Sequence, residues 1–117
     1  MSKYIVRIQL NHADSTDYTL LHEAMAEINF FRYLQGAFGF WYSLTNAMYY
    51  GAATLTAEQL QNHLDQMIEK LYTVENTPPT NHEILVIRED EYSYRLFRAK
   101  ADATDIPPPD RYLTAVI

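Results

Sequence analysis

Hydrophobic and polar residues alternate near the N-terminus, which predicts a β-strand over residues 3–10. Tyr4, Val6, Ile8 and Leu10 share one face of this strand. The polar stretch 11–17 is rich in residues that cap helices. Apolar residues then recur at helical spacing, which predicts an amphipathic helix over 15–28 that stops at Asn29.

The middle of the chain is aromatic and reads as strand. Residues 30–35 form one predicted strand, and the two glycines of 36–39 favour a hairpin connection. Residues 40–50 form the next, bulged or split at the polar pair Thr45-Asn46. We expect Gly51 to end this strand.

A second helix is predicted over 57–72, because Thr56 and Gln59 match a capping box and apolar residues follow on one stripe. Residues 77–81 read as a proline-containing linker. A short apolar strand is predicted over 83–88 and a further one over 92–97. The terminal residues 112–117 could add a strand or clasp a partner.

This order, β-α-β-β-α-β, is typical of the ferredoxin-like arrangement. We therefore expect an α+β fold in which two helices cover one face of an antiparallel sheet, plus an extra C-terminal strand and tail. The expected domain spans residues 1–98, with a proline-containing tail at 99–117 whose removal should leave the fold intact. The open sheet face would be aromatic, which predicts a homodimer or another partner.

Composition narrows the function classes. The chain of 117 residues has no cysteine, which excludes disulfide scaffolds, thiolate zinc sites and cysteine nucleophiles. Neither a signal peptide nor an apolar run long enough to span a membrane is evident, so we expect a cytoplasmic protein without a membrane partner. The net charge of −6 disfavours nonspecific nucleic-acid binding, but it leaves room for a local basic groove.

The first half of the chain resembles a known bacterial family. The matching residues are Val6–Leu10, Ala13-Asp14, Asp17-Tyr18, Leu21–Met25, Phe30 or Phe31 with Arg32, Tyr42–Thr45, Ala47, Tyr49 and Gly51–Thr54. They are similar to the small GhoS-type antitoxin endoribonucleases of type V toxin–antitoxin systems. The resemblance covers about residues 4–71, with 84–89 as closing strand, and implies an RNA-cleaving or RNA-associated dimer with a ferredoxin-like fold. The chain departs from it at Thr45, where relatives carry proline, and beyond Arg98.

Several residues could carry RNA chemistry. Cleavage needs a base for the 2′-hydroxyl proton and a cation for the phosphorane oxygens, or else a carboxylate-held Mg²⁺. The catalytic candidates are Arg32, His12 and Asp14, where Asp14 is the position that the resemblance matches to a metal-binding acid. Arg7, Arg32 and Tyr49 are the candidates for RNA binding on the open sheet face.

Each candidate also has a structural interpretation. Asp14 can cap the first helix, His12 can be an exposed turn histidine, Arg32 can close the sheet edge through an ion pair, and Tyr49 can belong to the core. No spaced set of ligands indicates a metal site, and Mg²⁺ is the one cofactor that the mechanism leaves open.

Two functions from different classes fit the sequence. The first is an antitoxin-type endoribonuclease that binds single-stranded RNA over the sheet. The alternative is an acidic, non-catalytic module that binds or inhibits a protein such as a nuclease. Convergence of Arg7, Arg32 and Arg95 on one groove would favour RNA, whereas an unbroken acidic face opposite the helices would favour inhibition.

Overall fold

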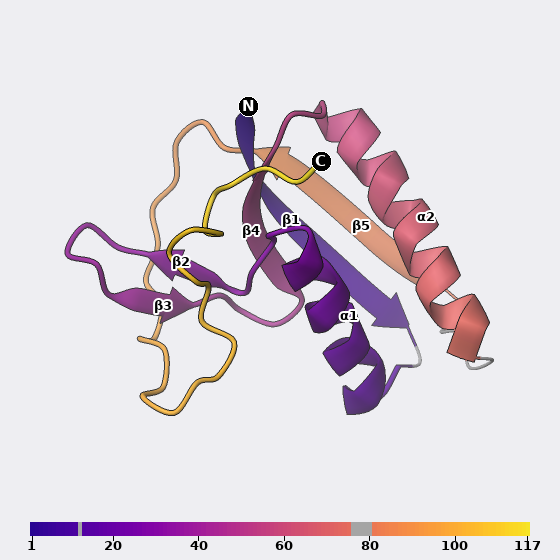
Figure 1. Ribbon diagram of the computed structural model, residues 1–117, viewed down its shortest axis with the longest axis horizontal. Helices are drawn as coiled ribbons and strands as arrows, with labels where there is room; N and C mark the ends of the chain where they lie inside the picture. Colours follow the sequence, from indigo (N-terminus) through magenta and orange to yellow (C-terminus); the bar gives the residue numbers. More distant parts are fainter. Residues whose placement is uncertain (12, 76–80) are drawn as a thin grey trace.

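The computed structural model describes residues 1–11, 13–75 and 81–117 (Figure 1). Its elements, in chain order, are β1 (Ser2–Asn11), α1 (Ser15–Glu27), β2 (Tyr33–Gln35), β3 (Trp41–Ser43), β4 (Met48–Ala53), α2 (Ala57–Glu75) and β5 (Asn81–Arg88). Residues 77–80 of the predicted linker, like His12, lie outside the described residues. The linker's last residue, Asn81, already belongs to β5.

The strands form two antiparallel sheets. One has the order β4-β1-β5, and the other is the β2-β3 hairpin. A single bridge between Phe31 and Tyr50 joins the segment before β2 to β4. The α+β class with two helices and antiparallel sheets is thereby confirmed.

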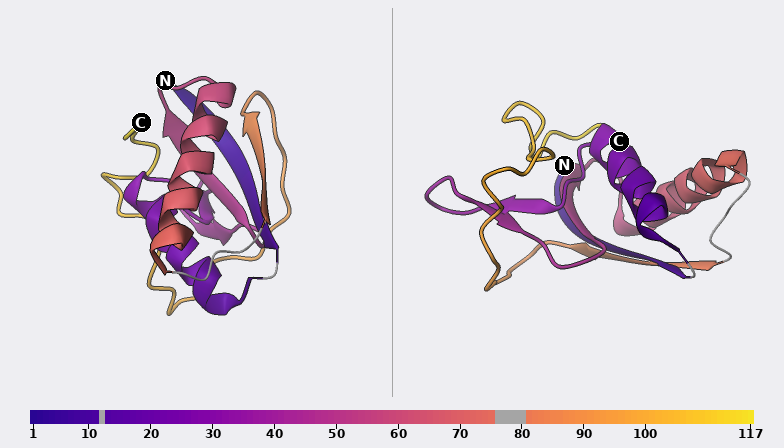
Figure 2. Two further views of the ribbon diagram at one scale, coloured as in Figure 1. Left: turned by 90° about the vertical axis from the view of Figure 1, so that its right-hand side faces the viewer. Right: turned by 90° about the horizontal axis from the view of Figure 1, so that it is seen from below.

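Both helices cover the same face of the three-stranded sheet (Figure 2). Alternate residues of β1 point towards them and are buried, as the sequence pattern predicts. The core joins these β1 residues to apolar side chains of both helices, namely Leu21, Met25, Leu60, Leu64, Ile68 and Tyr72. On the opposite face of the sheet, Leu85 and Ile87 of β5 are exposed.

Local capping fixes where the helices begin and end. Asp14 and Asp17 form a reciprocal capping box at the start of α1. Asn29 follows the end of α1 with a φ of 61°, the left-handed conformation that terminates helices. Thr56 and Gln59 form the predicted capping box before α2. These three sequence predictions are confirmed.

The aromatic run 40–50 is split around the polar pair 45–46 into β3 and β4, one of the two forms that the sequence predicts. Two other strand predictions need correction. The first concerns Gly51, because β4 continues through this residue to Ala53. Gly51 does not end the strand. It allows a close approach, because a Cβ there would lie 2.7 Å from the Asn29 carbonyl oxygen.

Residues 92–97 form no strand. The chain instead touches β3 through a bridge between Tyr42 and Arg98 and through two backbone hydrogen bonds, Ser43 N to Phe97 O and Ala99 N to Trp41 O, both 2.9 Å. The rings of Tyr92 and Tyr94, which could have alternated in a strand, pack instead against other tyrosines.

The C-terminal tail crosses the hairpin and returns along the molecule to end near the start of α2 (Figure 1). Arg111 donates from Nε to the Asn29 side chain at 2.7 Å, and Asn29 donates to the Thr114 carbonyl at 3.0 Å. Thr54 N donates to the Ile117 carbonyl at 2.7 Å, and Ile117 packs against the core. The tail is therefore tied to the body of its own chain by interactions distant in sequence.

Candidate functional site

A cavity of about 450 Å³ lies at the end of β1 that β4 does not reach. In the paired register, β4 begins at Met48 opposite Arg7, so the last residues of β1 extend beyond it. The cavity lies between this strand end, helix α1 and the loop 44–47. Its remaining lining residues are Arg7, Gln9, Tyr18, His22 and Arg32.

Tyr18 closes one wall of this cavity. Its hydroxyl accepts a hydrogen bond from Leu10 N at 2.9 Å and donates to the Leu10 carbonyl at 3.3 Å. Among the described residues, β4 pairs with β1 only as far as Arg7, so the Tyr18 side chain satisfies backbone groups of Leu10 on this side of the strand. The contact holds α1 at a fixed position beside the cavity.

His22 lines the cavity as a neutral imidazole. Burial, assisted by the nearby Arg32 cation and opposed by Asp105, lowers the pKa of His22 to about 4. Its Nδ1 lies 2.7 Å from the hydroxyl of Tyr49, which is fully buried. Burial raises the pKa of Tyr49, so the Tyr49 hydroxyl keeps its proton. Among the described contacts, this hydroxyl donates its proton to Nδ1 of His22. We accordingly assign the imidazole proton to Nε2, which makes His22 a hydrogen-bond donor.

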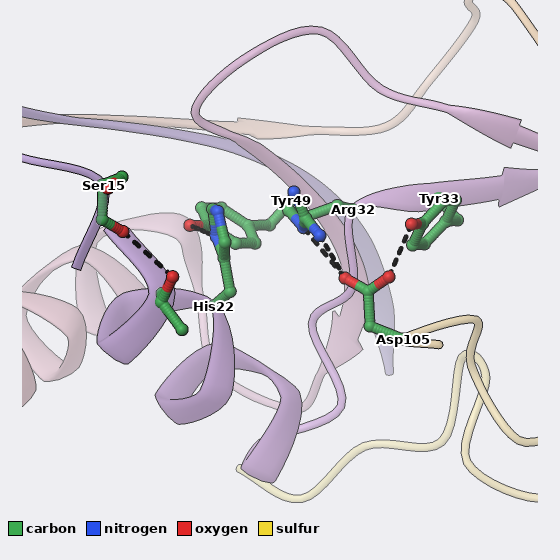
Figure 3. A network of polar contacts seen from close by, with 7 residues as sticks. Ser15, His22, Arg32, Tyr33, Tyr49 and Asp105 are labelled. Carbon is green, nitrogen blue, oxygen red and sulfur yellow. Dashed lines mark hydrogen bonds and ion pairs between the residues drawn. The ribbon is translucent and has the colours of Figure 1, made fainter. Parts of the chain in front are cut away.

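Arg32 lies between His22 and the tail residue Asp105 (Figure 3). The guanidinium donates from Nε and Nη2 to one oxygen of Asp105, the first at 3.1 Å. Tyr33 donates to the other oxygen at 2.6 Å. Since a guanidinium carries five N–H donors, this pairing uses only two of them.

The Asp105 carboxylate is held ionised. Its burial alone would raise its pKa, but the hydrogen bonds from Tyr33 and Arg32 and the Arg32 charge outweigh burial and lower that pKa. Arg32 and Asp105 also line a second cavity, of about 320 Å³, with Phe31, His22 and Glu23.

The structure brings two predicted site residues together and separates the others. Arg7 and Arg32 line the same cavity, but Arg95 is not among its lining residues. Asp14 is the N-cap of α1, and the structural interpretation of that residue is confirmed. Arg32 does form an ion pair, yet it still lines the cavity. His12 lies outside the described residues.

Tyr49 needs a correction as an RNA-stacking residue. It pairs with Val6 on the helix-facing side of the sheet and has no exposed surface. A ring that is fully buried cannot stack on a base. What the tyrosine contributes to the site is its hydroxyl, which orients His22.

Sequence reasoning missed His22, Tyr18 and Asp105. Tyr18 and His22 are four residues apart and therefore share one face of α1, a spacing that could have paired them. Nothing local could have indicated Asp105, which reaches Arg32 from 73 positions away. The cations of the cavity wall are the guanidinium groups of Arg7 and Arg32, which are the donors that an anion site requires.

Two further searches cover the described part of the chain. Within it, no group of three or more His, Asp or Glu side chains is placed to hold a metal ion. Among the same residues, no helix combines the length and the apolar character that a membrane crossing requires.

Comparison of the chain with protein-family models, curated proteins and solved structures finds no match. The likeness to GhoS-type antitoxins therefore stays a hypothesis from the sequence, and the site must be interpreted from its own chemistry.

Proposed function

We propose that the protein binds single-stranded RNA, with a backbone phosphate in the cavity between α1 and the end of β1. One observation carries the proposal: Arg7, Arg32 and the imidazole of His22 line this one cavity. Two guanidinium groups and an imidazole N–H supply charge-assisted donors for phosphate oxygens. Single strands suit a cavity at a sheet end better than a duplex does, because their backbone can bend into it.

The distribution of charge favours RNA over the acidic-inhibitor alternative. Helices α1 and α2 together contain seven carboxylate residues and one lysine, which equals the whole net charge of −6. The rest of the chain is balanced, with eight of each sign. The acidic surface therefore belongs to the helical layer, and the face opposite the helices is not an unbroken acidic surface.

RNA cleavage is the second function that these residues favour. Two guanidinium groups and an imidazole N–H in one cavity are donors that would stabilise a phosphorane. The lowered pKa of Asp105 makes that carboxylate a weak base, so binding takes precedence in this proposal. The sequence resemblance implies an antitoxin-type endoribonuclease. Such an enzyme would also need a general base that accepts the 2′-hydroxyl proton once RNA is bound.

The fold proposal goes with the function. We infer a ferredoxin-like ancestry in which the segment before β2 lies beside β4, supported by the Phe31–Tyr50 bridge. In this interpretation, strands β5, β1 and β4 are three of the four strands of the expected sheet, in the expected order. The β2-β3 hairpin then extends the fourth strand.

The test is a binding titration with a fluorescently labelled single-stranded RNA at low salt. We expect Arg7→Gln and Arg32→Gln each to weaken binding by about 10-fold, the loss of one charge-assisted contact. Lys70→Gln is the matched control, because it removes a cation from an exposed position of α2, outside the cavity. Melting curves should show little change, since the exposed Arg32–Asp105 pair is worth only about 0–1 kcal/mol.

The same proteins should be incubated with pooled labelled RNA, with and without Mg²⁺. Fragments that disappear in Arg32→Gln would support cleavage, and intact RNA would restrict the protein to binding. If wild-type protein binds no RNA, or if Lys70→Gln weakens binding as much as Arg7→Gln does, the proposal is wrong. A pull-down for a protein target would then test the acidic-module alternative.

A further inference from the structure

A row of aromatic side chains begins on the face of β4 opposite the helices and leads to strand β3 of the hairpin. Tyr50, Tyr92, Tyr94 and Tyr42 contact one another in sequence, with centroid distances of 6.2, 6.1 and 5.5 Å. Tyr92 and Tyr94 are stacked, with 24° between their planes. Only Tyr50 is a buried member. We call these four residues the tyrosine row.

Two members of the row, Tyr92 and Tyr94, are exposed although they are stacked on each other. Tyr92 and Tyr94 keep 40% and 41% of their surface accessible, and Phe40, two residues before Tyr42, keeps 45%. A core function would have buried these rings, because each offers a large apolar area. Rows of accessible rings are the surface on which successive bases of a single strand stack.

Cations accompany the row on the hairpin side. The Arg98 guanidinium lies 3.9 Å from the centre of the Phe40 ring, and Arg98 is bridged to Tyr42. Arg95 is also exposed. The acidic turn 89–91 lies at the other end, where Glu89 accepts from the Tyr50 hydroxyl. The cations therefore lie at the Tyr42 end of the row, which would attract a phosphate backbone, and the carboxylates lie at the Tyr50 end.

The row is continuous with the phosphate cavity through the sheet. Arg7 lines that cavity and pairs with Met48, and Tyr50 follows two residues later on the same face of β4. A strand anchored at Arg7 and Arg32 can therefore pass over the open face towards Tyr92. We propose that the tyrosine row is a stacking platform that extends the RNA site beyond its phosphate anchor, an inference that rests on the proposed function.

Oligonucleotide length separates the two surfaces. Labelled A₄ tests the cavity alone, and labelled A₁₂ is long enough to reach the row. We expect wild-type protein to bind A₁₂ about 10-fold or more tighter than A₄, as stacking of one to two bases would produce. The double variant Tyr92→Leu/Tyr94→Leu should lose that gain and bind A₄ within about 2-fold of wild type.

Two variants control for folding and for aromatic surface in general. Tyr92→Phe/Tyr94→Phe keeps the rings and should retain A₁₂ binding. Phe38→Leu changes a 90% exposed ring at the hairpin tip, outside the row, and should bind as wild type does. Melting curves of all variants confirm that each is folded.

The outcomes are distinct. If the leucine double variant binds A₁₂ as tightly as wild type, or if A₁₂ gains nothing over A₄, the platform is overturned while the cavity proposal stands. If wild-type protein binds neither oligonucleotide, the proposed function itself fails. If a labelled proline-rich peptide binds and the leucine variant loses it, the row serves a protein partner and not RNA.

Discussion

Single side chains in this protein have roles that their residue type does not indicate. Tyr49 is an aromatic residue in a strand, yet its contribution to the site is a buried hydroxyl that fixes His22. Arg32 both closes an ion pair with Asp105 and lines the cavity. The structural and the functional interpretation of a residue therefore need not exclude each other.

The buried histidine predicts a pH-dependent stability. In the folded protein the pKa of His22 is about 4, below its ordinary value of 6.5. The unfolded chain thus binds more protons between these values, so the stability due to neutral His22 is present above pH 6.5 and is lost as pH falls towards 4. His22→Asn keeps a polar atom near Tyr49 and should show a smaller fall in melting temperature from pH 7 to pH 5.

The control for this prediction is His63, a histidine of α2 whose side chain is exposed to solvent. His63→Asn should follow the wild-type profile across the same pH range. Identical profiles for wild type and His22→Asn would mean that the imidazole is accessible to protons in the folded state.

At the scale of elements, the sequence predicted the features that depend on interactions between residues close together in the chain. The N-terminal capping motifs, the Asn29 stop and the helical stripes depend on residues within one or two turns, so α1 and α2 could be read from the sequence. The path of the tail depends on contacts made across the chain, such as Thr54 with Ile117. The pairing of Asp105 with Arg32, 73 positions apart, is likewise a juxtaposition that no spacing encodes.

The tail contacts change the expected result of truncation. The sequence predicts that a chain ending at Arg98 keeps its fold, but residues 99–117 hydrogen-bond to Asn29, Gln35 and Thr54. Tyr112 also packs edge-on against Trp41 at 4.8 Å. We expect the truncated chain to lose at least about 2 kcal/mol of unfolding free energy, because several buried contacts disappear together.

Urea denaturation followed by Trp41 fluorescence measures this loss. The point variant Arg111→Ala removes the contacts to Asn29 and to the Ala26 carbonyl and should produce part of it. Equal midpoints for the full and the truncated chain would show that the tail only rests on the surface.

At the scale of the whole molecule, the tail takes over surface that a partner would otherwise cover. The sequence predicts a homodimer from an aromatic sheet face and a strand-like tail, but the tail clasps its own chain. The homodimer stays a proposal on a different surface. Leu85 and Ile87 are 56% and 48% exposed on β5, the outer strand of the sheet, and an apolar edge strand favours pairing with a second copy.

Light scattering at about 50 μM tests that surface, because a dimer with a micromolar Kd would be mostly associated at this concentration. We expect wild-type protein to be dimeric and Ile87→Lys to be monomeric, because a charge on the edge strand opposes pairing. Monomeric wild-type protein at this concentration would contradict the dimer.

The separation of charge between the layers predicts how salt affects RNA binding. Each phosphate contact on a single strand lowers the slope of log K against log salt by about 0.7, because condensed counterions are released. Arg7 should contribute a full contact. Arg32 should contribute less, because binding there also displaces or shares the Asp105 carboxylate that already neutralises the guanidinium. We therefore expect Arg7→Gln to flatten the slope by about 0.7 and Arg32→Gln by less.

Asp105→Asn should raise the affinity at low salt and steepen the slope, since it frees the Arg32 charge for phosphate. A weaker affinity in Asp105→Asn would instead mean that the carboxylate positions Arg32 for binding. A slope unaffected by Arg7→Gln would mean that RNA is held elsewhere on the molecule.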